Sequence, residues 1–186
     1  MTVGIIVAIV AVVLVVWFIA MYNGLVKLRN NRENAFANID VQLKQRFDLV
    51  PQLVNTVKGY ATHEKEVLEK VTAARAAAMN ANTVDEKVAA DKALSGALAG
   101  LRVSLEAYPD LKANQNFLQL QTELSDIENK LSAARRFFNS TTRELNNACE
   151  VFPSNIIAGM FHFTRATMYE ATENRETLNK APEVKF

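Results

Sequence analysis

The chain has 186 residues, of which 49% are hydrophobic, and its 21 lysines and arginines nearly balance its 20 aspartates and glutamates. This balance excludes the basic excess of a nucleic-acid-binding protein, so nucleic acid is not an expected partner. The length allows one ordinary domain together with a membrane segment, and the few glycines and prolines favour long helices joined by short connections.

The chain opens with a long uncharged run, VGIIVAIVAVVLVVWFIAMY, at residues 3–22. As a helix this run covers about 30 Å, which matches the hydrocarbon core of a bilayer. A cleaved signal peptide has a basic start, a shorter apolar core and a small-residue cleavage site, whereas this chain begins MTVG and no Ala-x-Ala follows the run. We therefore predict an uncleaved transmembrane anchor over residues 1–23, with a signal peptide as the weaker alternative.

The residues at the end of this run predict how the anchor sits in the membrane. Three basic side chains, Lys27, Arg29 and Arg32, follow the run, and only the α-amino group precedes it. Because lysine and arginine are retained on the cytoplasmic side, we expect the N-terminus outside and the helical domain in the cytoplasm, at the cell membrane. Trp17 and Tyr22 are expected at the headgroup level. The basic group either sets this topology alone or also attracts anionic lipid, by about 1 kcal/mol per charge.

An apolar stripe at helical spacing begins directly after the run, without an intervening linker. It consists of Leu25, Leu28, Ala35, Ile39, Leu43, Phe47, Val50, Val54 and Val57. The stripe indicates one helix that leaves the bilayer and continues into the cytoplasm. Asp48 is a good N-cap, and Pro51 fits the first turn of a helix that begins there. The pair therefore marks either a kink in one long helix or a restart that reverses its direction.

Two arginines, Arg32 and Arg46, lie near this stripe. Each either pairs with a carboxylate, within the bundle or between subunits, or stays solvated with its stem along the helix. The local candidates for such a pair are Glu33, Asp40 and Asp48.

Three further stripes predict the rest of the helical domain. Val67, Val71, Ala74 and Ala78 mark a helix between residues 63 and 81, and Thr83 with Glu86 has the spacing of a capping box that opens a helix ending near Ala107. The longest stripe predicts a helix over residues 111–152, with Asp110 as its N-cap and Pro153 beyond its end. Its members are Phe117, Leu120, Leu124, Ile127, Leu131, Ala134, Phe138, Leu145, Ala148 and Phe152.

These stripes predict an all-α fold, in which an N-terminal transmembrane helix continues into an antiparallel bundle of three to four long helices over residues 24–152. A kink at Pro51 gives three helices in the bundle, and a restart gives four. Residues 153–186 form an apolar motif and a C-terminal tail.

The segment FPSNIIAGMFHF, residues 152–163, is too short to span a bilayer and too apolar for a free linker. It is expected to pack on the end of the bundle, with contact to a neighbouring subunit and insertion into the membrane interface as the second and third alternatives. Its candidate contact residues are Phe152, Pro153, Ile156, Ile157, Met160, Phe161 and Phe163.

No pattern of catalytic, cofactor-binding or metal-binding residues emerges. Neither His63 nor His162 follows a glutamate at the spacing of a di-iron site, and Val67 stands where a zinc-protease helix needs its second histidine. A phosphate-cradling glycine loop and a nucleophile elbow are both missing from the sequence. The single cysteine, Cys149, falls beside the longest stripe and is predicted to be a packing residue. We expect a protein without cofactors that is not an enzyme.

Several blocks resemble the bacterial LemA family. They are YNGLVKLRNNRENAFANIDVQLKQRFDLVPQLVNTVKGYATHEKEVLEKVTAARA, YPDLKANQNFLQLQTELSDIENKLSAARRFFNSTTRELNNACEVFPSNIIAGMF and the closing APEVKF, so the resemblance covers nearly the whole chain from residue 22 onward. The resemblance implies a single-pass membrane protein with an all-helical soluble domain and no established enzymatic activity. A relative in magnetotactic bacteria is associated with shaping magnetosome membranes.

The anchor, the long helices without a linker and the resemblance together favour a membrane-anchored scaffold that forms homo-oligomers and organises or remodels the lipid bilayer. The alternative is a membrane-tethered binding module for a membrane-protein client, such as a protease, an envelope-stress factor or a signalling partner.

Overall fold

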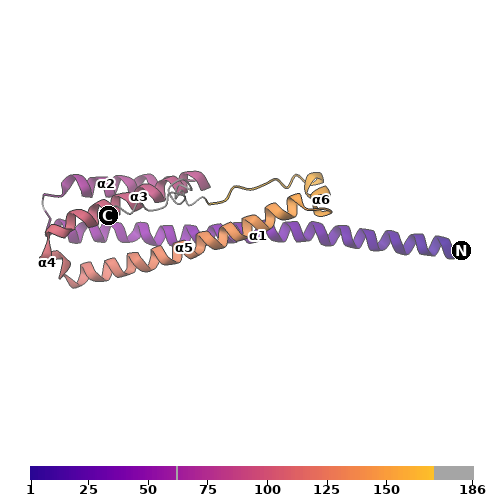
Figure 1. Cartoon of the computed structure of the whole chain (residues 1–186), viewed down its shortest axis with the longest axis horizontal. Coiled ribbons are helices and arrows are strands. Elements are labelled where there is room, and N and C mark those ends of the chain that lie inside the picture. The colour runs from indigo at the N-terminus through magenta and orange to yellow at the C-terminus, as the bar shows by residue number, and fades with distance from the viewer. Residues whose placement is uncertain (62, 170–186) are drawn as a thin grey trace, which may run out of the picture.

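The computed structural model describes residues 1–61 and 63–169, and these are all helices, turns and short connections (Figure 1). The elements in chain order are α1 (Thr2–Lys58), α2 (Lys65–Met79), α3 (Val84–Ser104), the 3-10 turn η1 (Leu105–Ala107), α4 (Pro109–Lys112), α5 (Gln115–Glu150) and α6 (Ser154–Met160). The predicted all-helical class and the long apolar N-terminal helix are confirmed for this part of the chain. Most of the predicted C-terminal tail, residues 170–186, lies outside it.

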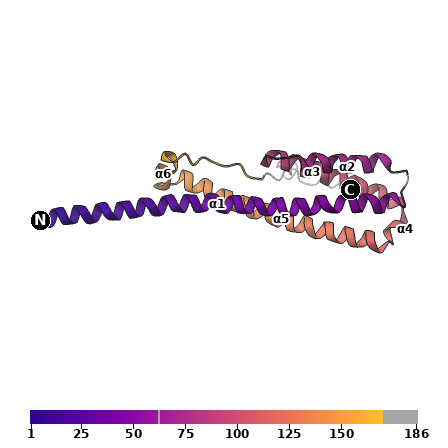
Figure 2. The ribbon, with the colours of Figure 1, turned by 180° about the vertical axis from the view of Figure 1, so that it is seen from behind.

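The molecule is a rod built around α1. This helix has 57 residues and is therefore about 85 Å long. Helix α5 runs back along one side of α1, while α2 and α3 lie together on the other side, so that α1 is the central element of the domain (Figures 1 and 2). The N-terminal part of α1 extends beyond all other elements.

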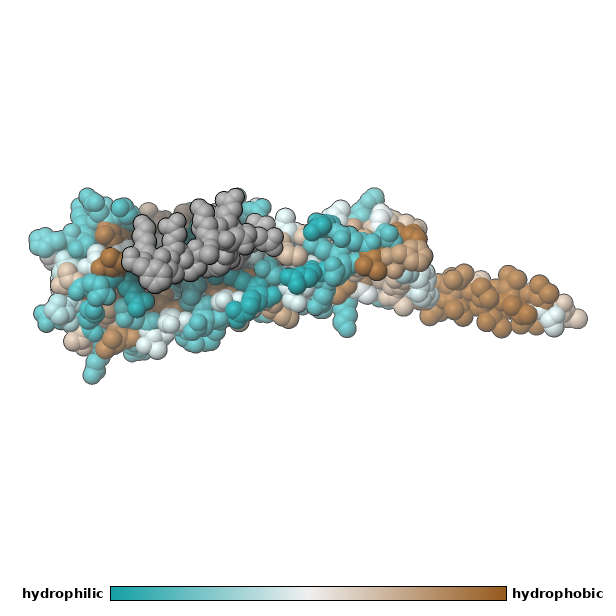
Figure 3. Space-filling view, viewed as in Figure 1, coloured by the Kyte–Doolittle hydropathy of each residue, from teal (hydrophilic) through white to brown (hydrophobic). Residues whose placement is uncertain are grey.

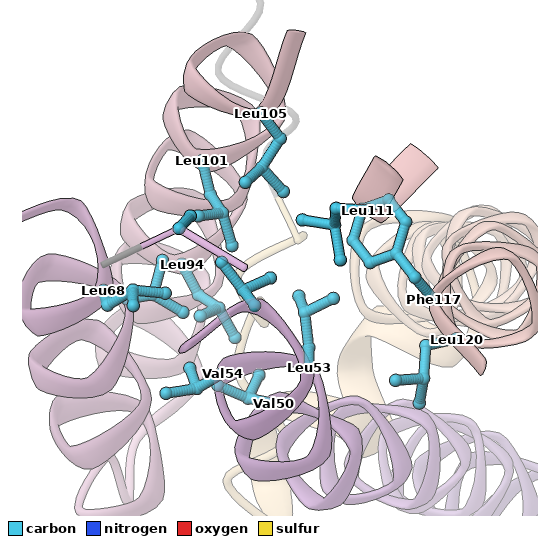
Figure 4. Close-up of a cluster of buried hydrophobic side chains, with 13 residues drawn as sticks. Val50, Leu53, Val54, Leu68, Leu94, Leu101, Leu105, Leu111, Phe117 and Leu120 are labelled. Atoms are coloured by element: carbon cyan, nitrogen blue, oxygen red, sulfur yellow. The ribbon is translucent and has the colours of Figure 1, made fainter. Parts of the chain in front are cut away.

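The predicted stripe of α1 supplies the core at every level of the rod. Its buried members are Leu25, Ala35, Ile39, Leu43, Val50, Val54 and Val57. At the end far from the N-terminus they meet leucines of α2 and α3 and the start of α5, and Figure 4 shows Val50, Leu53 and Val54 pointing toward Leu94, Leu101 and Phe117. In the middle, Ala35, Ile39 and Leu43 pack on Leu131 and Phe138 of α5. A third, small cluster contains Leu25 and two residues of α6.

The helix that begins after Thr83 carries the predicted capping box. The Thr83 hydroxyl accepts a hydrogen bond from the Glu86 backbone N–H at 3.2 Å, and the Glu86 carboxylate accepts one from the Thr83 N–H at 3.0 Å. These two bonds satisfy donors that the first turn of a helix otherwise leaves open.

The predicted bounds of the longest helix were wrong at both ends. Asp110 does not cap it, because Pro109–Lys112 forms the separate turn α4 and the side chain of Asn114 instead accepts a hydrogen bond from the Phe117 N–H at 3.1 Å. At the other end, α5 stops at Glu150, so Phe152 leaves the stripe and is 74% exposed. The first difference arises because an asparagine with extended backbone is as good an N-cap as an aspartate. At the other end, the backbone of Val151 is already extended, so the helix cannot continue to Phe152.

Helix α1 continues without a break through Pro51, so the restart that the sequence left open does not occur. A helical residue at position 51 would donate its N–H to the carbonyl oxygen of Phe47, and proline has no N–H to give. The Nε–H of Arg75, on α2, donates to that same oxygen at 2.7 Å. A side chain from a neighbouring helix thus replaces the missing backbone bond. Asp48 caps nothing here and pairs with Lys44 at 2.9 Å.

This replacement predicts an energetic coupling between Arg75 and Pro51. Arg75→Leu should lower the free energy of unfolding by about 1–2 kcal/mol, because it leaves the half-buried Phe47 carbonyl without a donor. In a Pro51→Ala background the backbone N–H returns, and Arg75→Leu should then cost clearly less. Urea unfolding of the four proteins of this double-mutant cycle, followed by circular dichroism, measures the difference. Equal costs in both backgrounds would show that Arg75 does not compensate for the proline.

Candidate functional site

The first part of α1 is a fully exposed apolar surface. The large apolar residues between Val3 and Val16 are each more than half exposed, and the helix is long and apolar enough to cross a membrane. Figure 3 shows this segment as an uninterrupted apolar projection from a largely hydrophilic body. In the first twenty residues only Phe18 is partly buried, which marks the level at which other parts of the protein first touch α1.

Residues 152–163, which include helix α6, make this contact and form a collar that packs on one side of α1. Ile157 and Ala158 are buried against Leu25. The ring of Phe161 lies 4.6 Å from that of Tyr22 and 6.0 Å from that of Phe18, measured between centroids. The collar thus covers one side of α1 at the point where the uncharged run ends.

The remaining predicted contact residues divide between the two faces of the collar. Phe163 is half-buried, with its ring centroid 6.2 Å from that of Tyr22, and Pro153 is also half-buried. Three large side chains face outward, with exposed fractions of 74% for Phe152, 55% for Ile156 and 61% for Met160. Phe161 is 45% exposed, although one side of its ring packs on Tyr22. Packing on the domain therefore accounts for only one face of the motif.

The basic residues predicted at the membrane interface have different environments. Lys27 and Arg29 are exposed, and the guanidinium of Arg29 lies 5.3 Å from the ring centroid of Phe163 in the collar. Arg32 instead turns into the protein. Its Nε donates to the Thr142 hydroxyl at 3.2 Å and its Nη2 to the Thr167 carbonyl oxygen at 3.1 Å. Burial lowers the pKa of Arg32, and the negative charge of Glu33 opposes this change. Trp17 directly precedes Phe18 on α1, toward the exposed apolar segment, and is 45% exposed.

The collar ends in a tight reversal of the chain. His162 has φ 57°, in the left-handed region, and its N–H donates to the Gly159 carbonyl while the Phe163 N–H donates to that of Ala158 at 2.9 Å. This pair of bonds is a Schellman motif, in which glycine or asparagine is more usual than histidine. His162 therefore forms the turn that ends α6.

After this reversal, residues 164–169 run back along α5 and are held by two asparagines. The amide of Asn146 donates to the Ala166 carbonyl at 3.0 Å and accepts from the Ala166 N–H at 2.8 Å, and Asn139 does the same for Tyr169 at 2.8 and 2.7 Å. The two asparagines are separated by about 10.5 Å of helix, and the two residues they bind by about 10 Å of extended chain. Because the two spacings match, Asn139 and Asn146 on one face of α5 can bind two residues of the returning segment at the same time.

A buried group of charges lies where the returning segment ends. Asp91 of α3 is 4% exposed and accepts from Arg46 of α1 at 2.7 Å and from Arg135 of α5. Arg46 also pairs with Glu128 at 2.9 Å, and the hydroxyl of Tyr169 donates to Asp91 at 3.3 Å. One carboxylate thus ties together α1, α3, α5 and the returning segment.

The predicted local partners of the two arginines were therefore wrong. Asp40 pairs with Lys87 at 2.6 Å rather than with an arginine of its own helix, and neither Glu33 nor Asp48 is bonded to Arg46. The sequence does contain a signal for the true pair, because Arg46 and Asp91 each occupy a position of an otherwise apolar stripe. The pairing could not be predicted from either stripe, because the two residues lie on different helices.

Tyr169 makes the free energy of unfolding depend on pH. Burial and, after it, the charge of Asp91 raise the pKa of Tyr169 to about 12, against about 10 for an unfolded tyrosine. The folded state therefore holds the proton more tightly. The resulting stabilisation is complete below about pH 10 and is lost as the pH rises toward 12, at about 1.4 kcal/mol per pH unit.

Tyr169→Phe should remove this part of the pH dependence. The advantage of the wild type over the variant in free energy of unfolding should shrink between about pH 10 and pH 12, where the tyrosine is ionised in the unfolded state but still protonated in the folded state. Urea unfolding of both proteins at a series of pH values measures it, and the comparison cancels the titration of the other groups. Parallel stability curves would contradict the assignment.

The other residues singled out by sequence lie in ordinary surroundings. Cys149 packs at the edge of the collar cluster, and burial, with a smaller contribution from Glu150, raises the pKa of its thiol, which makes it a poor nucleophile. His63 is exposed in the turn before α2. Among residues 1–61 and 63–169, no three histidine, cysteine or acidic side chains are grouped so that they could hold a metal ion.

Comparison of the sequence with known proteins identifies relatives and a family. Protein LemA of Metamycoplasma hominis is 27% identical over 157 aligned residues, which cover 84% of this chain and 72% of that protein. Magnetosome protein MamQ of Magnetospirillum gryphiswaldense is 21% identical over 189 aligned residues, covering 88% of this chain and 70% of that protein. The sequence model of the LemA family matches residues 35–186, from the middle of α1 to the end of the chain. The chain belongs to the LemA family.

Proposed function

We propose that this protein is a single-pass, membrane-anchored helical scaffold that self-associates and organises or remodels the bilayer. The observation that carries the proposal is the continuity of α1, which is fully exposed and apolar at its start and forms the central core helix from Leu25 onward. Because no flexible linker separates the two parts, the direction of the anchor fixes the direction of the whole rod. Neighbouring rods that associate must then also align or tilt their anchors.

The orientation that we propose has the N-terminus outside and the antiparallel bundle in the cytoplasm. Its support is the pair of exposed cations, Lys27 and Arg29, which directly follow the apolar segment. The name of the relative in Magnetospirillum gryphiswaldense, a magnetosome protein, is consistent with a membrane setting.

The first test is the size of the full-length protein after gentle extraction from membranes, by mass photometry and electron microscopy. The scaffold requires assemblies many times the 20.7 kDa chain. Particles of one or two chains under several mild extraction conditions would reject it.

A second test separates anchoring from mechanical coupling. A flexible glycine–serine insertion between Asn23 and Gly24 should leave the protein in the membrane but abolish any effect on the shape of reconstituted giant vesicles, because it uncouples rod and anchor. The matched control carries the same insertion between Ala81 and Asn82, in the turn between α2 and α3, and should behave like the wild type. Equal effects of the two insertions would contradict the coupling.

A second candidate function, a tethered binding module, is favoured by one surface. A groove between α3 and α5 is lined by the apolar residues Leu98, Leu118 and Leu124, and by the polar residues Arg102, Asp126 and Glu128. Such a groove suits an amphipathic helix of a client protein. A photo-crosslinker in place of the exposed Leu118 at the groove edge, used in native membranes, should then capture one defined partner, whereas the scaffold predicts crosslinks between copies of this chain or none.

A further inference from the structure

We propose that the outer face of the collar is a lipid-docking surface, which inserts into the interface of the leaflet from which α1 emerges. The face consists of Phe152, Ile156 and Met160, with the exposed part of the Phe161 ring at its edge toward α1. The proposal rests on the proposed function in one respect, since it requires the apolar part of α1 to cross the bilayer. It adds a second membrane contact that the anchor alone does not supply.

The first step of the argument is the level of the collar along α1. The uncharged run of about 30 Å fills the hydrocarbon core, so its last residues lie at the edge of that core. Phe161 contacts two of these residues, Phe18 and Tyr22, and Ile157 packs on Leu25, only about 4.5 Å farther along the helix. The collar is therefore held within about one helical turn of the membrane edge.

The second step is the chemistry of the outer face. Ile156 and Met160 are four residues apart on α6 and therefore lie on one face of it, away from the buried Ile157 and Ala158. Phe152 precedes the helix and is 74% exposed. Residues 151–163 contain no aspartate, glutamate, lysine or arginine, so insertion would bury no formal charge. Figure 3 shows apolar surface at this end of the body, adjoining the apolar projection of α1. Lipid at that level would cover both the outer face of the collar and the apolar part of α1.

The third step is the polar boundary around the face. Lys27 and Arg29 are exposed beside the collar, and the guanidinium of Arg29 lies over Phe163. Cations at this level meet lipid phosphates and anionic headgroups. At seven residues, α6 is too short to cross the bilayer, so it contacts a single leaflet. Apolar side chains facing the membrane with cations beside them are the pattern of an interfacial helix.

The test measures the depth of single nitroxide labels in the full-length protein, with Cys149→Ala as background. The protein is reconstituted in vesicles of equimolar phosphatidylcholine and phosphatidylglycerol. Labels replace Ile156 and, in a second variant, Met160. Val10 in the apolar part of α1 and Val103 on α3, which are 52% and 74% exposed, are the matched apolar controls. All four side chains are exposed, so labelling removes little packing.

Power saturation then compares collisions with oxygen, which concentrates in lipid, and with a water-soluble nickel chelate. We expect the labels at positions 10, 156 and 160 to favour oxygen and the label at position 103 to favour the chelate. Labels at 156 and 160 that resemble 103, or that are shielded from both agents with spin–spin broadening from a second copy, overturn the lipid contact alone. If the label at position 10 also favours the chelate, the membrane anchor and the proposed function fail with it.

Discussion

Replacing Asp91 with asparagine should lower the free energy of unfolding by about 3 kcal/mol, the lower end of the range for breaking a buried ion pair. The substitution keeps the shape of the side chain but removes the buried negative charge that faces both Arg46 and Arg135. Arg46 is itself only 6% exposed, so water cannot take over the role of the carboxylate. Glu128 remains beside both arginines and limits the loss.

The matched control is Asp126→Asn. Asp126 pairs with Lys130 at 2.7 Å, and both side chains are more than half exposed. An exposed pair of this kind contributes less than about 1 kcal/mol, because solvent screens it. Urea unfolding of the two variants in mild detergent, followed by circular dichroism, measures both effects. Similar losses for Asp91 and Asp126 would mean that the buried group does not hold the helices together.

The position of Asp91 also suggests why a buried charge is present at all. An apolar side chain could pack at several heights along a neighbouring helix, whereas a carboxylate shared by two arginines fits at one height only. The group thus fixes how α1, α3 and α5 are set against one another. Because α1 also carries the exposed apolar segment, this register determines which part of the domain lies beside that segment.

Phe138→Ala should lower the free energy of unfolding by about 3–5 kcal/mol. The ring is fully buried in the middle core, 5.5 Å from the ring of Phe36 between centroids, with the guanidinium of Arg32 4.8 Å from its centroid. Truncation leaves a cavity between α1 and α5 and removes both aromatic contacts. The loss is large because helices fixed by the neighbouring ion pairs have little freedom to close the cavity.

The next residue provides the control, since Phe137 is 54% exposed on the same helix. Phe137→Ala removes the same side chain from the same local sequence and should cost less than about 1 kcal/mol. Thermal unfolding of the two variants gives the comparison. A loss at Phe137 as large as that at Phe138 would indicate that this surface is covered in the folded protein, for example by another copy of the chain.

Local sequence patterns were sufficient for the helices and their inner faces. The stripe from Leu25 to Val57 is buried largely as predicted, and the Thr83–Glu86 capping box forms, because helical periodicity and capping depend on residues three or four positions apart. The same patterns misplaced the start of α5, since Asp110 and Asn114 are both acceptable caps and only the path of the chain selects one.

By itself, the sequence determined the helical class, the uncharged N-terminal segment and the family, since composition, spacing and the residue pattern define them. The tertiary structure alone decided how Pro51 is accommodated, which carboxylate Arg46 meets and which face of the collar stays exposed. Arg75 reaches Phe47 across 28 residues, Asp91 reaches Arg46 across 45, and Phe161 reaches Tyr22 from the other end of the chain. Such contacts depend on how whole helices pack, and no pattern within a single helix encodes them.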